Sequence, residues 1–324
     1  MTPEHDRSQD SEQIAQKIKE LANQGLFTEA EQLRDQMMRD NPMALNLIVS
    51  TGEVIEEEKT KNLDLDHMAV WKTLYDDLSS EETNCLFYGT KQATLESGKL
   101  LVSQGKLNNR LFFIDNGRVT VFYHKDKKNI PIIQLSRGDI LGEETFFGIS
   151  FCSLSAVTQS EVNLRHISRK EAQTWHDKAP GLFEKLADFC RKHGKSERAV
   201  VRKNLERRTY QRHPCKGNAT AYLIDGQGNK SQTYFRGGIE DISQSGVCFS
   251  MKCSKQETAR ALLGKEIEIT IIIPEGEIKR ICHGTIVKVS FHLHNDYSVH
   301  VRFKNLLEEA EFKPMISNND SDTD

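Results

Sequence analysis

The C-terminal part of the chain is organised around residues 241–246, which read Asp-Ile-Ser-Gln-Ser-Gly. Asp241 and Ser243 alternate at what is predicted to be the end of a strand, so both side chains point to the same face. Gly246 then allows a sharp turn of the backbone, in a conformation that a residue with a Cβ resists. The stretch therefore predicts a strand end that presents a carboxylate and a hydroxyl to a common partner.

A second motif precedes it, Arg-Thr-Tyr-Gln-Arg at residues 208–212. Guanidinium is planar and always charged, and its fork of donors matches phosphate oxygens or the O6/N7 edge of guanine. The spacing lets Arg208 and Arg212 approach one compact ligand from different sides. A basic cluster alone is more often solvated surface, and an Asp-x-Ser-x-x-Gly segment alone is more often a simple turn. Their order and strand context together favour a site for an anionic guanine nucleotide.

Both motifs resemble the signatures of the PilZ domain, a bacterial receptor module for cyclic di-GMP. The surrounding Glu-Arg-Arg-Thr-Tyr-Gln-Arg-His-Pro and Gly-Gly-Ile-Glu-Asp-Ile-Ser-Gln-Ser-Gly-Val-Cys-Phe fit the usual context of these signatures. Over residues 206–310 the resemblance implies a six-stranded antiparallel barrel whose arginine loop folds over the ligand. The cyclic di-GMP-binding residues that it implies are Arg207, Arg208, Arg212, Asp241, Ser243 and Gly246.

Within that set the implied roles differ. Arg208 and Arg212 would bind phosphate and guanine, Asp241 and Ser243 would bind guanine edges, and the glycine would be structural. The position of Arg207 resembles the one that, in the family, favours binding of an intercalated pair of ligand molecules. Binding of one ligand molecule per chain and binding of two are both compatible with the sequence.

The segment after the second motif has the period-two pattern of a small barrel. Isoleucine occupies every second position from Ile267 to Ile273, with mostly polar neighbours, which predicts a half-buried strand that Pro274 ends. Residues 278–291 and 297–303 supply two more alternating strands. Helical propensity is confined to residues 254–263, so the domain is predicted to be rich in β-structure.

A second block of short strands lies upstream. Residues 111–123 contain Asn-Gly, which accepts the positive φ of a tight turn and predicts a hairpin. Residues 138–147, Gly-Asp-Ile-Leu-Gly-Glu-Glu-Thr-Phe-Phe, resemble the phosphate-binding cassette of the cyclic nucleotide-binding domains of catabolite activator proteins and kinases. The resemblance implies an eight-stranded jelly roll flanked by helices over residues 63–195.

The cassette departs from its family at the phosphate. Glu143 matches the carboxylate that, in the family, accepts a hydrogen bond from a ribose hydroxyl. Leu154 stands at the position where an arginine of the family would bind the cyclic phosphate. Loss of a charge-assisted hydrogen bond removes about 1.5–3 kcal/mol. We therefore predict a roll that does not bind cyclic AMP and that serves docking, dimerisation or signal transmission, with an unrelated ligand as the alternative. The residues of this degenerate cassette are Gly142, Glu143, Leu154 and Ser155.

Helical segments are predicted at both ends of these domains. Apolar residues at helical spacing on either side of Gly25 predict a helical hairpin over residues 1–62, faintly similar to one tetratricopeptide repeat and closed by Asn41-Pro42. Residues 196–205 predict a linker helix. The acidic, polar residues 311–324 predict a disordered tail.

Composition narrows the class of protein. The chain has 324 residues, of which 37% are hydrophobic and 28% charged, with a formal net charge of −3. This balance is ordinary for a soluble chain of two or three domains and argues against DNA as a partner. No apolar leader and no stretch of about 20 apolar residues is present, which predicts a cytoplasmic protein without a membrane span. Seven scattered cysteines without a CxxC pair predict reduced thiols and no metal site, and an exposed strand face is preferred to metal binding for His292 and His294.

No catalytic motif emerges, since GGDEF, EAL, HD-GYP, GxSxG and P-loop signatures are all missing. We predict a non-enzymatic cyclic di-GMP receptor without other cofactors, in which the ligand orders residues 207–212 and changes the domain arrangement or the binding of an unidentified protein partner. A homodimer stays open. A cyclic AMP sensor that uses the roll and a ligand-free interaction scaffold are the alternatives.

Overall fold

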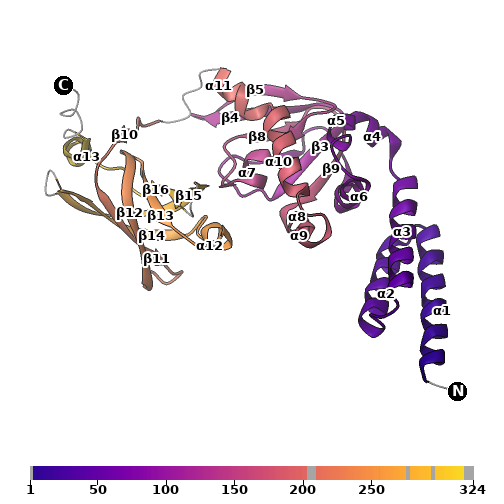
Figure 1. The fold of residues 1–324 in the computed structure, drawn as a ribbon. Helices are drawn as coiled ribbons and strands as arrows, with labels where there is room; N and C mark the ends of the chain where they lie inside the picture. The colour runs from indigo at the N-terminus through magenta and orange to yellow at the C-terminus, as the bar shows by residue number, and fades with distance from the viewer. Residues whose placement is uncertain (1–2, 203–208, 255, 275–277, 293–295, 317–324) are drawn as a thin grey trace.

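The computed structural model describes residues 3–202, 209–254, 256–274, 278–292 and 296–316. Three parts follow one another along the chain, namely a helical unit, a jelly roll and a β-barrel (Figure 1). The helical unit projects from one side of the roll and the barrel lies on the other, so the first and the last helix are far apart (Figure 1).

The helical unit has one helix more than the predicted hairpin. Its helices are α1 (Pro3–Asn23), α2 (Phe27–Asp40) and α3 (Leu45–Lys61). Ile48 and Ile55 of α3 are separated by about two helical turns and are buried in the same core as α1 and α2. Two helices of this size cannot bury their apolar faces alone, and α3 completes the core. Its fully or nearly buried members are Ala15, Ile18, Ala22, Ala30, Met37, Ile48 and Ile55.

Short helices flank the roll, as the cassette resemblance implied. They are α4 (Leu65–Val70), α5 (Lys72–Tyr75), α6 (Ser80–Gly89), α7 (Glu143–Phe147), α8 (Arg169–Gln173), α9 (Trp175–Lys178) and α10 (Leu182–His193). Ser79 caps α6, because its Oγ accepts a hydrogen bond from the Glu82 N–H at 3.2 Å and the Glu82 Oε2 accepts one from the Ser79 N–H at 2.8 Å. This reciprocal capping box fixes where α6 begins.

Two four-stranded antiparallel sheets form the jelly roll and enclose an apolar core. The first has the strand order β1 (Lys91–Leu95), β9 (Val162–Ser168), β3 (Arg110–Asn116), β6 (Ile140–Leu141). The second has the order β2 (Leu100–Val102), β8 (Ser155–Thr158), β4 (Val119–Lys125), β5 (Lys128–Leu135). The jelly roll expected from the cassette is confirmed.

The predicted hairpin over residues 111–123 is wrong. Strands β3 and β4 follow each other in the sequence, but β3 pairs with β6 and β9 whereas β4 pairs with β5 and β8. Gly117 does have the positive φ, 96°, that an Asn-Gly turn supplies. The turn therefore carries the chain from one sheet to the other, and local sequence does not distinguish this corner from a hairpin.

The barrel is a closed antiparallel sheet of six strands, as expected. Their order is β12 (Lys230–Ser243), β11 (Asn218–Ile224), β14 (Glu266–Ile273), β15 (Ile278–Phe291), β16 (Asp296–Phe303), β13 (Gly246–Lys252), and the pairing of β12 with β13 closes the ring. A short strand β10 (His213–Pro214) adds to β12. The isoleucines at alternate positions of β14 are at most 2% exposed, so their predicted inward face is confirmed. Side chains fill the interior, as they do in other small barrels.

A strand of the roll extends the sheet of the barrel. Thr285 of β15 pairs with Glu266, the first residue of β14, and Ile286 is still hydrogen-bonded to Gly264 and Lys265, so the edge that β14 leaves uncovered begins at Val287. Strand β7 (Ile149–Ser150), which follows α7 directly, pairs with this free edge. The paired residues are Ile149 with Val289 and Ser150 with Lys288.

Two further contacts hold β7 on the barrel. The Phe151 N–H donates to the Val287 carbonyl at 3.3 Å. The Ile149 side chain is 5% exposed and belongs to the apolar core of the barrel, although it comes from the roll. An exposed edge strand is open to unwanted pairing, and β7 covers this edge. The roll and the barrel are therefore joined by backbone pairing as well as by the chain.

Three helices complete the C-terminal part: α11 (Ser196–Arg202), α12 (Gln256–Ala261) and α13 (Glu309–Ile316). Helix α11 lies in the predicted linker helix, of which residues 203–205 fall outside the described ranges. The predicted disordered tail is wrong for residues 311–316, because Phe312 and Met315 of α13 are buried against the barrel. Apolar side chains within an acidic segment supply the burial that a disordered tail would lack.

Candidate functional site

Arg212 and Asp241, one residue from each predicted motif, meet on the outside of the barrel. Strand β10 directly follows Arg212 and pairs with the end of β12, so that Pro214 lies opposite Asp241. The Arg212 Nη1 donates to the Asp241 Oδ1 at 2.6 Å, and the two side chains are 18% and 32% exposed. The short distance and partial burial make this a charge-assisted pair rather than a loose surface contact.

A β-bulge places a second carboxylate beside this pair. The register between β12 and β13 shifts between Ile239 and Asp241, which leaves Glu240 as the extra residue. The Glu240 carboxylate accepts hydrogen bonds from the Cys248 Sγ at 3.2 Å and from the Ser298 Oγ at 2.8 Å. In a regular strand, consecutive side chains point to opposite faces. The bulge instead brings the side chains of Glu240 and Asp241 to one side.

His300 on β16 links the two carboxylate neighbourhoods. Its Nδ1 lies 3.4 Å from the Arg212 Nη1, and its Nε2 lies 3.9 Å from the Cys248 Sγ. Burial, and next the charge of Arg212, lowers the pKa of His300 from 6.5 to about 4. Burial, and next the hydrogen bond to Glu240, raises the pKa of the Cys248 thiol. At neutral pH the imidazole is therefore uncharged and the thiol protonated, so Arg212 carries the positive charge of this group of residues.

Ser243 is the last residue of β12 and Gly246 the first of β13, so they pair on either side of the tight turn. Ser243 is 2% exposed, and its Oγ donates to the Gly246 carbonyl and lies near the Ser245 Oγ, both at 3.3 Å. The expectation that Gly246 needs a special turn conformation is wrong, because it is a strand residue of β13 without positive φ. Glycine is required for a different reason: a Cβ there would come within 2.2 Å of the Val301 carbonyl oxygen on β16.

The other predicted arginines, Arg207 and Arg208, lie outside the described residues. The described barrel site therefore consists of Arg212 with its neighbours on three strands. Its members are Arg212, Glu240, Asp241, Cys248, Ser298 and His300.

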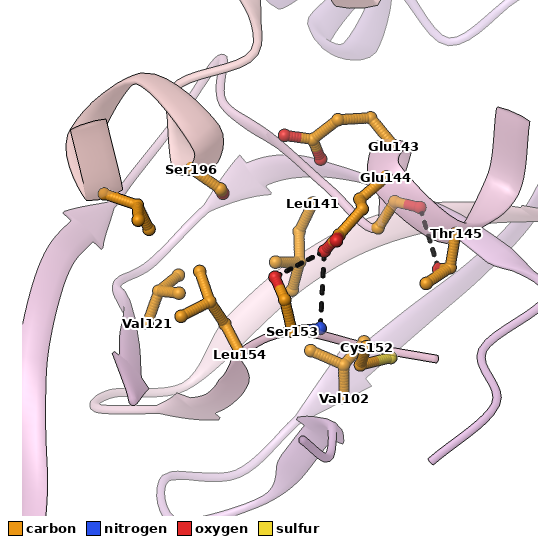
Figure 2. A pocket seen from close by; sticks show the side chains of 12 residues that line it. Val102, Val121, Leu141, Glu143, Glu144, Thr145, Cys152, Ser153, Leu154 and Ser196 are labelled. Atoms are coloured by element: carbon orange, nitrogen blue, oxygen red, sulfur yellow. Dashed lines mark hydrogen bonds between the residues drawn. The ribbon is translucent and has the colours of Figure 1, made fainter. Parts of the chain in front are cut away.

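The degenerate cassette of the roll encloses a cavity, to which α11 contributes a wall (Figure 2). Of the four predicted cassette residues, Gly142, Glu143 and Leu154 line it. Gly142 has φ 96°, and a Cβ there would come within 2.4 Å of the Arg110 carbonyl oxygen, so the start of α7 depends on glycine. Ser155 does not line the cavity, and its Oγ accepts a hydrogen bond from the Gln104 N–H at 2.9 Å.

A carboxylate that the sequence reading left out, Glu144, also faces this cavity. Its Oε2 accepts a hydrogen bond from the Ser153 Oγ at 2.6 Å (Figure 2). Leu154 is 7% exposed, and burial raises the pKa of the nearby Cys152 thiol to about 11. The cavity is therefore apolar on one wall and negatively charged on another.

The described residues contain neither a metal-binding cluster nor a membrane-spanning helix. Across the described ranges, no group of three or more His, Cys, Asp or Glu side chains could hold a metal ion. His292 instead has its Nε2 2.5 Å from the Ser298 Oγ, and His294 lies outside those ranges. No helix in the described part of the chain is long and apolar enough to cross a membrane.

Sequence reasoning missed His300, Cys248 and Glu240. The apolar residues of β16 alternate from Tyr297 to Phe303, so the intervening Ser298 and His300 could have been assigned to the opposite face. Their approach to Arg212 depends on which strands are neighbours. The position of Glu240 depends on the bulge, for which the sequence carries no separate signal.

Comparison with known families divides the chain in the same way. The family model of the cyclic nucleotide-binding domain matches residues 92–178, and that of the PilZ domain matches residues 206–313. A cyclic nucleotide-binding domain precedes a PilZ domain in this chain. Both are receptor domains that are typically non-catalytic, and together they support a regulator that binds a cyclic nucleotide or cyclic di-GMP. No match was found among curated proteins.

Several solved structures are similar to part of the chain. A cyclic nucleotide-binding-like protein from Brucella abortus is 24% identical, with 34% of this chain and 97% of that chain covered and a TM-score of 0.31. A cyclic nucleotide-binding domain from Methylobacillus flagellatus is 19% identical, with 42% and 81% covered and a TM-score of 0.37. The Thermus thermophilus catabolite activator protein is 21% identical, with 40% and 61% covered and a TM-score of 0.35.

Proposed function

We propose that this protein is a non-enzymatic receptor for cyclic di-GMP, with the dinucleotide bound at the barrel site. The observation that carries the proposal is the 2.6 Å contact between Arg212 and Asp241, because it unites one residue of each PilZ motif at one place. Guanidinium donors beyond the one used on Asp241 match phosphate oxygens or the guanine O6/N7 edge. The second carboxylate oxygen of Asp241 can accept hydrogen bonds from the N–H groups of guanine.

The charges near this site require a further cation. Glu240 and Asp241 bring two carboxylates close to Arg212, whereas cyclic di-GMP carries two phosphates. A dianion is held more tightly where positive charge exceeds negative charge. In the proposal Arg207 and Arg208 supply that excess when they close over the ligand. Whether they close on one ligand molecule or on two is a question of stoichiometry for the same experiment.

The effect of the ligand is proposed to pass to the roll by two connections. Helix α11 forms a wall of the cavity in the roll and leads into the segment with Arg207 and Arg208. Strand β7 holds the cassette on β15, and Lys288 of β15 lies between Ser150 of β7 and His300 of β16. A ligand shifts the arrangement only when it binds one arrangement more tightly than the other. Altered contact with a protein partner is the proposed output.

A cytoplasmic location remains part of this proposal. None of the seven cysteines, from Cys85 to Cys282, is assigned to a disulfide in the described part of the chain. Thiols in this number fit a reducing compartment.

Calorimetric titration of the full chain tests the proposal. We expect saturable binding of cyclic di-GMP, no comparable binding of cyclic di-AMP, and an affinity at least about tenfold lower in Arg208→Ala, which corresponds to about 1.4 kcal/mol. Arg236→Ala is the matched control, because this exposed arginine on β12 packs on Tyr234 instead of joining the site. Equal affinities of wild type and Arg208→Ala would contradict the proposed site. No binding of any cyclic dinucleotide would favour the scaffold alternative.

A further inference from the structure

The cavity in the roll has the walls of a ligand site. The space free of protein atoms is about 560 Å³ when its solvent-open mouth is included. Val102, Val121, Leu141 and Leu154 supply an apolar wall from the core of the roll, and α7 supplies a polar one (Figure 2). Val200 of α11 is 3% exposed and lines the cavity on its remaining side.

The charge of this cavity is opposite to that of a phosphate site. The lining residues, all within the described part of the chain, include the carboxylates of Glu143 and Glu144 and no Lys, Arg or His. Leu154, at the position where the cassette resemblance implies a phosphate-binding arginine, presents an apolar side chain instead. Two carboxylates in a partly buried cavity repel an anionic ligand and attract hydrogen-bond donors and cations.

One polar atom in the cavity wall has no partner of its own. The Ser196 Oγ is buried and lacks a hydrogen-bond partner among the described residues. Ser196 begins α11 and lines the cavity, as Figure 2 shows. Buried polar groups are nearly always hydrogen-bonded, and those that are not commonly mark a place for water or a ligand. The hydroxyl can both donate and accept, so it suits a ligand with hydroxyl or amino groups.

We infer that this cavity binds a small ligand without phosphate or any other anionic group, uncharged or cationic, with an apolar body and hydroxyl or amino donors. The apolar wall holds the body of the ligand, Glu143 and Glu144 accept hydrogen bonds from its donors, and Ser196 gains the partner that it lacks. Since Ser196 and Val200 both belong to α11, the ligand contacts the helix that leads to the barrel. This site does not depend on the binding of cyclic di-GMP.

Two matched pairs of probes test the charge preference on the full chain by calorimetry. Adenosine and cyclic AMP share a base and a sugar, and 2-phenylethylamine and phenylacetate share a ring. We expect at least one of the phosphate-free probes, adenosine or the amine, to bind at least ten times more tightly than its anionic counterpart. Adenosine alone would indicate an uncharged ligand, and the amine alone a cationic one. An anionic probe that binds as tightly as its counterpart, or no saturable binding by any of the four, would overturn the inference.

Substitutions then assign the preference to the cavity. Leu154→Arg should reverse it, so that cyclic AMP binds more tightly than adenosine, whereas Leu100→Arg, at a 59% exposed leucine of β2, should change nothing. Ser196→Ala should weaken the bound probe several-fold and raise the melting temperature of the ligand-free chain, because it removes a buried hydroxyl without a partner. Ser80→Ala, at an exposed serine, is its control. An unchanged probe affinity in Ser196→Ala would contradict the assigned contact, even if Leu154→Arg does not fold.

Discussion

Consecutive carboxylates occur in both candidate sites, and their neighbours differ. In the barrel, a bulge turns Glu240 and Asp241 to one side, where Arg212 pairs with Asp241. In the roll, Glu143 and Glu144 begin a helix, and Leu154 lies on the opposite wall of the cavity. Two domains that resemble nucleotide receptors thus differ in whether they keep a cation. We infer that the single change to Leu154 alters the charge of the ligand that the roll accepts.

The two sites also differ in how freely they can change. The cavity of the roll is bounded by α7 and α11, and α7 continues directly into β7 on the barrel. The barrel site is built on paired strands, with Arg212 held just outside them. A structural change in the roll should therefore alter the pairing of β7 with β15 more than it alters the carboxylates of the barrel.

The largest expected effect comes from separating the two domains. Ile149→Asp places a carboxylate where an isoleucine is buried in the core of the barrel, and we expect a loss of about 3 kcal/mol of docking free energy. Hydrogen exchange measured by mass spectrometry should show loss of protection within residues 287–291, and scattering should show an expanded chain. Ile281→Asp, at a 58% exposed isoleucine of the same strand, is the control. Full protection in Ile149→Asp would mean that β7 does not cover this edge in solution.

Arg212 tests the barrel side of the comparison. Arg212→Ala should lower the affinity for cyclic di-GMP by about tenfold to a hundredfold, because a charge-assisted contact of about 1.5–3 kcal/mol is removed. Titration calorimetry measures the change. Arg212→Lys should recover only part of the affinity, since a point charge does not reproduce the planar fork. Equal binding by wild type and Arg212→Ala would separate the Arg212–Asp241 pair from ligand binding.

Substitution of Gly142 tests whether a local destabilisation of the roll also changes ligand binding by the barrel. Gly142→Ala combines a positive φ with a Cβ placed 2.4 Å from a carbonyl oxygen, and we expect a loss of about 1–2 kcal/mol of stability. Gly98→Ala, with φ 83° and nothing within 4 Å of the added Cβ, separates the backbone strain from the clash. Thermal denaturation measures both variants. A change in cyclic di-GMP affinity in Gly142→Ala alone would show that the roll influences the barrel.

His300 gives the smallest predicted effect, a pH dependence. Its pKa is about 4 in the fold against 6.5 ordinarily, so between these values the unfolded chain binds more protons. The free energy of unfolding should therefore fall as the pH drops from about 6.5 towards 4, and stay unaffected by this group above that window. His300→Gln should flatten this part of the profile in chemical denaturation, whereas His124→Gln, at an exposed histidine of the roll, should not. An identical profile for wild type and His300→Gln would contradict the assignment.

Strand periodicity predicted three of the six barrel strands, because buried positions in a strand repeat at intervals of two. The isoleucines of β14 and the two long strands after it follow from that pattern alone. Strand β7 could not be predicted, since two residues show no periodicity and its partner lies far away in the sequence. The corner at Asn116-Gly117 was mistaken for a hairpin for the same reason, because membership of a sheet is not a local property.

The candidate sites likewise contain residues that the sequence predicts and residues that only the folded structure brings together. The contact between Arg212 and Asp241 follows from two motifs that a sequence displays directly. His300 and Glu240 enter through strand register and a bulge, which arise only when the barrel closes. In the roll, Leu154 was recognised as a departure from its family, but Ser196 was not, because α11 returns to the cavity only in the folded chain.

Because β7 of the roll pairs with β15 of the barrel, both truncation and domain exchange should disturb the fold. A chain cut after the roll would expose Ile149 together with unpaired backbone groups, and an isolated barrel would show an open edge on β15. Both fragments would tend to self-associate during expression. Gene fusions that exchange either domain alone would meet the same obstacle, so this pair of domains is expected to be transmitted as a single cassette-and-barrel unit.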